Sequence, residues 1–125
     1  MKKLVLALLA TAGLSVAVLS TADATPFIKY GAIAYDMATG RYGFSYNYDA
    51  AWQARNRALG ECGWGGCKVY ASFHNSCGAL ATDDNQRIFG WGVSYDRSEA
   101  QQRALYECRV RGGNCTIKVW SCTSR

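Results

Sequence analysis

The sequence has few of the residues from which small catalytic sites are built. It contains one histidine, His74, and one proline among 125 residues. A nucleophile pair would need that histidine beside an activated hydroxyl or thiol and an orienting group. No Gly-x-Ser-x-Gly elbow, His-Glu-x-x-His helix or Walker-type phosphate loop occurs. We therefore expect no catalytic residue, and we interpret His74 as a histidine at a strand end.

Cys-x-x-Cys pairs are also absent, which argues against a zinc site. Four residues separate Cys62 from Cys67, whereas six separate Cys108 from Cys115, so the spacing is irregular. An even number of cysteines in a short chain indicates a disulfide framework instead. We expect neither a metal nor a cofactor.

Acidic residues are few and scattered, which makes a small hydrolase the least favoured function. Paired carboxylates can hydrolyse glycosides. Asp49 and Asp96 precede predicted helices, however, and we interpret them as helix caps. The remaining acidic residues are interpreted as turn or solvated groups.

One long apolar run occurs, at the N-terminus. Lys2 and Lys3 precede the apolar residues 4–19, and the small-x-small sequence 22–24 follows. This pattern predicts a secretory signal peptide over residues 1–24. We therefore expect an exported protein, periplasmic or secreted, whose mature domain 25–125 has no membrane span.

Positive charge is in moderate excess. Fourteen basic residues against nine acidic residues give a net charge of +5. This balance favours an anionic partner such as an acidic protein or a charged cell-surface polymer. The excess is too mild to indicate nucleic acid, and predicted export also argues against it.

An internal repeat contains all six cysteines. Residues 62–77 and 108–122 each hold a cysteine, a glycine-rich link, a second cysteine, an alternating run and a third cysteine. The upstream run 31–34 likewise recurs as 78–81. The repeat therefore predicts one duplicated domain, with halves at about 31–77 and 78–125.

Each half shows the pattern strand, strand, helix, strand. Alternating side chains predict the strands, and alanines spaced four apart and ending at Cys62 and Cys108 predict the helices. The sequence therefore predicts an α+β fold. We expect one antiparallel-rich sheet with both helices on one face.

The repeat narrows the fifteen connectivities that six cysteines allow. Cys67 and Cys77 bracket an extended strand, so their Cα atoms lie too far apart for a disulfide. The preferred pairing is Cys62–Cys67, Cys108–Cys115 and Cys77–Cys122. We expect the last of these bonds to join equivalent points of the two halves.

The aromatic residues favour a binding surface. Tyr42, Phe44 and Tyr46 share one strand face, and Gly43 and Ser45 share the other. If the small residues lie under a helix, the rings form an open stripe that could stack on sugars. The reverse assignment makes the rings ordinary core, which is the default expectation.

Trp64 and the links provide the leading functional hypothesis. Trp64 lies on the first link, Arg109 and Arg111 lie on the matching link, and Lys118 and Trp120 share a strand face. Tryptophan and arginine are common anchors of protein interfaces. We therefore expect a non-enzymatic module that binds a protein partner, of the inhibitor, immunity or host-interaction type. A glycan, cell-wall ligand or anionic surface is the alternative.

Several of these motifs together carry a family resemblance. The run 31–35, the alanine-rich helix ending in cysteine, the glycine-rich links and the final Trp-Ser-Cys resemble the bacterial domain-of-unknown-function family 4189. The resemblance covers nearly the whole mature chain. It implies an exported bacterial domain with paired cysteines, and it brings no catalytic residue.

Overall fold

The computed structural model describes residues 27–124, so the predicted signal peptide lies outside the described residues. Both halves follow the predicted order of strand, strand, helix, strand. The elements are β1 (Tyr30–Tyr35), β2 (Tyr42–Tyr48), α2 (Ala51–Cys62), β3 (Lys68–His74), β4 (Cys77–Thr82), β5 (Phe89–Ser94), α3 (Arg97–Val110) and β6 (Thr116–Cys122). The α+β class and the duplication are confirmed.

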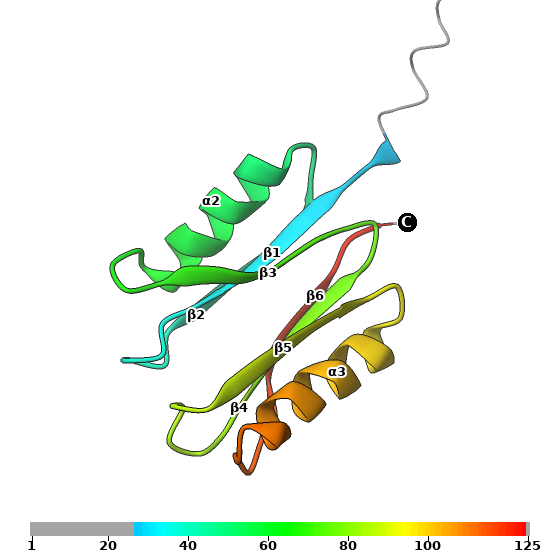
Figure 1. The fold of residues 1–125 in the computed structure, drawn as a ribbon. Helices are drawn as coiled ribbons and strands as arrows, with labels where there is room; N and C mark the ends of the chain where they lie inside the picture. The colour runs from blue at the N-terminus through cyan, green and yellow to red at the C-terminus, as the bar shows by residue number, and fades with distance from the viewer. Residues whose placement is uncertain (1–26, 125) are drawn as a thin grey trace, which may run out of the picture.

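The strands form two antiparallel sheets, with strand orders β2-β1-β3 and β5-β4-β6. The prediction of one sheet with both helices on one face is therefore wrong. The two sheets stack, and α2 and α3 cover their opposite outer faces (Figure 1). Each half places its small residues against its own helix. Its larger residues remain on the other face, and the two halves bury those faces against each other.

Very small residues form both contacts between helix and sheet. In the first half these are Ala32, Ala34, Ala54, Ala58, Cys62 and Cys67. A Cβ added at Gly43 would lie 2.1 Å from the carbonyl oxygen of Ala58, and one at Gly92 would lie 2.5 Å from that of Ala100. The helix backbones therefore rest directly on the strands, and glycine is required beneath them.

The larger apolar residues form the core between the sheets. Its buried members are Ile33, Tyr35, Ala71, Phe73, Leu80 and Val119. The central strands β1 and β4 are buried on both faces, which explains their continuous apolar sequences. The helices thus lie over the small residues. The aromatic side chains of β2 and β5 point away from them, except Tyr48, which packs on the helix side of the first sheet.

A one-residue bulge recurs at the same place in both halves. The register of β3 shifts opposite Ile33, and that of β6 shifts opposite Leu80. The extra residues are Tyr70 and Lys118. Tyr70 packs against Phe89 with ring centres 4.8 Å apart, whereas the Lys118 amine lies near the Tyr42 ring and the Gln86 side chain. The bulge therefore positions a functional candidate.

The three predicted disulfides are confirmed. The expectation that Cys77–Cys122 joins the two halves is wrong, because Cys77 begins β4 and lies opposite Cys122 in the same sheet. The corresponding pair of the first half is Tyr30 and His74, whose ring centres are 6.0 Å apart. All three disulfides therefore lie within a half.

Of the two predicted helix caps, the position of Asp96 is confirmed and that of Asp49 is wrong. Ala50 is the N-cap of α2, and Asp49 instead forms an ion pair with Lys29. Asp96 is the N-cap of α3 but makes no side-chain cap. Glu99 accepts a hydrogen bond from the Ser94 hydroxyl at 2.6 Å instead of completing a capping box.

The close approach of α2 to the first sheet predicts opposite effects for two glycine substitutions. Gly43→Ala forces a Cβ into the helix backbone. It should lower the free energy of unfolding by about 1–3 kcal/mol. The matched change Gly60→Ala lies within α2, where the added Cβ would be 3.7 Å from its nearest neighbour, the indole nitrogen of Trp64. It should raise that free energy by about 0.5–1 kcal/mol. Urea unfolding of the oxidised proteins measures both, and equal effects would contradict the packing.

Candidate functional site

The outermost strands β2 and β6 lie side by side along one flank of the two sheets. The Ser121 hydroxyl donates a hydrogen bond to the carbonyl oxygen of Ser45 at 3.1 Å. The backbone N–H of Ser124 donates to the side-chain oxygen of Asn47 at 2.8 Å. Side chains from both halves are therefore brought together there. We call the exposed rings of Tyr42, Phe44, Tyr46 and Trp120 the aromatic edge.

The aromatic edge leaves a large area of ring surface open to solvent. Tyr46 is 54% exposed and Trp120 is 42% exposed. A hollow of about 270 Å³ lies between them and is also lined by Phe44, Ser121 and Cys122. A contiguous exposed aromatic surface of this kind is typical of a binding site.

Two cations lie against these rings. The Arg97 guanidinium carbon is 4.6 Å from the centre of the Trp120 ring. The Lys118 amine is 5.6 Å from the centre of the Tyr42 ring and donates to the Gln86 side-chain oxygen at 3.0 Å. Cation–π attraction therefore holds positive charge beside the aromatic edge.

In the second half, the equivalent strand is β5, and arginine side chains cover its outer backbone. The Arg111 guanidinium donates to the carbonyl oxygen of Phe89 at 2.7 Å. The Arg103 guanidinium donates to that of Val93 at 3.0 Å. Arg111 also lies over the Trp91 ring at 5.7 Å. Arg103 of α3 and Arg111, which directly follows α3, thus cover the outer backbone of β5, and covering the backbone is a known protection of edge strands.

The predicted partner-binding residues do not form a single surface. Trp120 belongs to the aromatic edge and Lys118 lies beside it, whereas Arg111 donates a hydrogen bond to the backbone of β5. Trp64 is 54% exposed at the end of α2, and Arg109 is exposed at the end of α3. These helices occupy opposite outer layers (Figure 1).

Sequence reasoning missed Arg97 and Arg103. The signal for Arg103 lies in the repeat, because Glu99 stands four residues before it, whereas the equivalent Arg57 has Gln53 at that position. The sequence offers no such signal for Arg97, since its contact with Trp120 joins distant elements.

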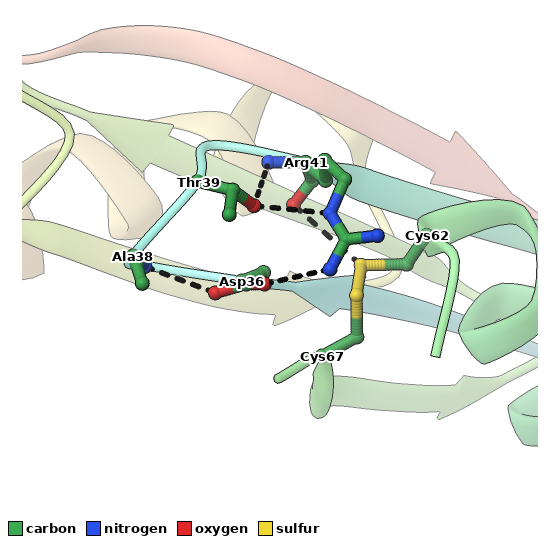
Figure 2. The surroundings of a disulfide bond; sticks show 6 residues. All are labelled: Asp36, Ala38, Thr39, Arg41, Cys62 and Cys67. Carbon is green, nitrogen blue, oxygen red and sulfur yellow. Dashed lines mark hydrogen bonds and ion pairs between the residues drawn. A yellow bond between two sulfur atoms is a disulfide. The ribbon is translucent and has the colours of Figure 1, made fainter. Parts of the chain in front are cut away.

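The link that carries Trp64 packs against the Asp36–Arg41 salt bridge. Figure 2 shows the Arg41 side chain between Asp36 and the Cys62–Cys67 disulfide. Arg41 donates to Asp36 at 2.9 Å, and a Cβ at Gly63 would lie 2.5 Å from the guanidinium. The hydrogen bond from Arg41 lowers the pKa of Asp36 below its usual 3.8, and the N–H of Ala38 contributes further. Asp36 therefore stays ionised.

A second hollow gathers polar side chains around His74. It measures about 380 Å³ and includes Ser72, Ser76 and Ser94. The hydrogen bond from Ser94 and the neighbouring Arg103 lower the pKa of Glu99. Within residues 27–124, no hydrogen bond joins the His74 ring to a hydroxyl, and no three His, Cys, Asp or Glu side chains are grouped to hold a metal ion.

The structure thus defines a duplicated α+β domain with two stacked sheets, a helix on each outer face and three disulfides within the halves. The chain belongs to the family described as Domain of unknown function (DUF4189), whose model matches residues 30–122. Among residues 27–124, no helix has the length and apolar character needed to cross a membrane.

The similar proteins include two from Mycobacterium tuberculosis. Protein Rv1269c is 38% identical over 93 residues, which is 74% of this chain and 68% of the relative. Rv1813c is 35% identical over 97 residues, which is 78% of this chain and 62% of the relative. The NMR structure of Rv1813c superposes with a TM-score of 0.61 at 32% identity, covering 96% of this chain and 99% of that one.

The Asp36–Arg41 pair predicts a specific pH dependence of stability. The lowered pKa means that the ionised carboxylate stabilises the fold fully above the unfolded value of about 3.9. This contribution is lost as the pH falls through the folded pKa. The loss of unfolding free energy in Asp36→Asn should therefore be constant near neutrality and shrink below about pH 4. Urea unfolding across pH measures it, with the exposed turn variant Asp84→Asn as control, and a constant difference would contradict the pairing.

The cover over β5 predicts a change in association. Arg103→Met with Arg111→Met removes both donors and two positive charges from the β5 edge. This variant should self-associate as its concentration rises, because the freed backbone can pair with another chain. Sedimentation velocity measures the effect. Arg55→Met with Arg109→Met removes the same charge from exposed positions and should stay like wild type; equal association in both variants would contradict the role of the cover.

Proposed function

We propose that the protein is an exported, non-enzymatic binding module whose aromatic edge binds an acidic protein partner. The observation that carries this proposal is the exposed pair Tyr46 and Trp120 flanked by Arg97 and Lys118. Tyrosine, tryptophan and arginine supply most of the binding energy in many interfaces. The net charge of +5 would also speed association with an acidic partner.

The acidic side chains and the disulfides support a non-enzymatic, exported module. Asp36 is paired with Arg41, Glu61 is paired with Arg57 on its own helix, and Glu107 is paired with Arg111, the C-cap residue of α3. These carboxylates serve the fold or the helix surfaces. The three disulfides suit an oxidising compartment, in keeping with the signal peptide expected at residues 1–24.

A glycan is the second candidate ligand. The hollow between Tyr46 and Trp120 presents exposed ring surface that a sugar could cover. Binding of a neutral glycan would depend little on ionic strength. Binding of an acidic protein would weaken as salt is added.

The proposed function predicts which substitutions weaken binding. The mature protein is used to capture partners from the producing bacterium, its competitors and any host, and a captured protein is then titrated by calorimetry. Trp120→Ala should reduce the binding free energy by about 2 kcal/mol or more. Lys118→Met should slow association and reduce its salt dependence.

Trp64→Ala is the matched control, because Trp64 is also exposed and lies at the end of α2. It should leave the affinity unchanged. If partner affinity falls in Trp64→Ala and in Arg109→Met but not in Trp120→Ala, the binding site lies on the glycine-rich links, as predicted from the sequence. A loss in none of the folded variants would contradict both sites.

A further inference from the structure

The backbone of β2 presents unused hydrogen-bonding groups along its outer side. The N–H of Asp36 donates to the carbonyl oxygen of Arg41 at 2.8 Å, so these residues form a hydrogen-bonded pair. Hydrogen-bonded and non-hydrogen-bonded pairs alternate along an antiparallel ladder. Tyr42 and Phe44 therefore direct their N–H and C=O groups away from β1.

The same alternation applies to β5, where it can be checked. The N–H of Asp83 donates to the carbonyl oxygen of Ile88 at 3.0 Å. Phe89 and Val93 then direct their carbonyl groups outward, and these are the two oxygens that Arg111 and Arg103 cover. In residues 27–124, no side chain donates to the carbonyl oxygens of Tyr42 and Phe44.

The difference between the two edges follows from substitutions within the repeat. Counted from the helix-end cysteines, the first link has Gly65 where the second has Arg111. The helix residue equivalent to Arg103 is Arg57, and it pairs with Glu61 at 2.7 Å instead of reaching the strand. The first half therefore has no arginine equivalent to Arg111, and Arg57, the equivalent of Arg103, does not reach the backbone of β2.

The open edge of β2 borders a groove. Beside α2 lies a hollow of about 440 Å³ lined by residues 44–48 together with Arg57 and Glu61. On the other side of the strand lies the aromatic edge with its smaller hollow. An extended chain placed along β2 would thus find space for the side chains of both its faces.

We propose that β2 accepts an extended, acidic protein segment as a fourth strand of the first sheet. This inference rests on the proposed function and adds the mode of binding. Main-chain hydrogen bonds would supply affinity, and pockets for alternate side chains would supply specificity. The segment would lie beside Tyr42 and Phe44, with one set of its side chains against the aromatic edge.

Charge complementarity identifies the segment as acidic. Arg97 and Lys118 flank the aromatic edge, whereas Arg57 in the groove beside α2 is paired with Glu61. Glu61 is the one acidic side chain that lines either hollow. A second copy of this chain, with its net charge of +5, would instead bring like charges together.

The test uses the oxidised protein and a blocked peptide of alternating valine and glutamate, seven residues long to match β2. Amide NMR spectra recorded during titration should show the largest changes at Tyr42, Phe44 and their neighbours, with slower hydrogen exchange. Affinity should fall as salt is added. A lysine-for-glutamate peptide should bind about tenfold or more weakly.

N-methylated peptides test the backbone pairing without altering the protein. Two versions carry N-methyl groups on the odd or on the even residues. One of them must lose about tenfold or more in affinity, because it cannot pair with β2. If both bind like the parent peptide, strand addition is wrong.

Two substitutions at one position separate the backbone from the ring. Phe44→Pro removes an outward N–H, which edge strands tolerate, whereas Phe44→Ala retains it. Peptide affinity should fall further in Phe44→Pro than in Phe44→Ala. Equal losses would contradict strand addition, and the N-methylated peptides decide the matter should the proline variant not fold.

The outcomes also separate this inference from the proposed function. If N-methylation has no effect but Trp120→Ala still weakens partner binding, the aromatic edge remains a binding surface and only strand addition fails. If the Tyr42 and Phe44 amides respond to protein concentration alone, a second copy occupies the edge and the acidic segment is wrong. Changes centred on β5 would likewise overturn the assignment.

Discussion

The rest of the structure depends on how closely each helix backbone lies on its own sheet. Glycine at positions 43, 90 and 92 lets α2 and α3 rest on the strands with no side chain between them. Such an interface is made from small residues and leaves the bulky ones on the opposite faces. Those faces can be buried only against each other. The stacking of the two halves, and the position of the aromatic rings of Tyr42, Phe44, Phe89 and Trp91, follow from this one constraint.

Most of the local structure could be predicted from the sequence, because each element has its own pattern. The repeat, both helices and the order of elements along each half depend on spacing, and the disulfide pairing depends on spacing and on the symmetry of the repeat. The number of sheets could not be predicted, since it depends on which strands share hydrogen bonds across the repeat. The role of Cys77 was misjudged for the same reason: it stands where the first half has Tyr30, within a strand and not at the end of the first half. Trp120 and Lys118 were recognised as candidates, but their nearness to β2 arises only from stacking.

The edge strands β2 and β5 occupy equivalent positions in the two halves, but their outer backbones are covered differently. An exposed edge strand is a liability, because it offers unpaired backbone groups to any other chain. In β5 the liability is removed by Arg103 and Arg111. In β2 the backbone remains open, and positive side chains stand beside it instead. Like charge discourages pairing between copies while leaving the edge available to a chain of opposite charge.

Within the described part of the chain, no disulfide joins the two halves, and the aromatic edge lies where they meet. In residues 27–124 the sheets are joined by the shared core and by a few hydrogen bonds, such as that from the Tyr35 hydroxyl to Gln86 and that from Ser121 to Ser45. The aromatic edge lies across this junction, since Tyr46 belongs to one half and Trp120 to the other. Under the proposed function, a partner bound there would contact both halves at once, and by linkage it would stabilise their association. Binding at this place would therefore reinforce a junction that no disulfide crosses and that depends on packing and a few hydrogen bonds.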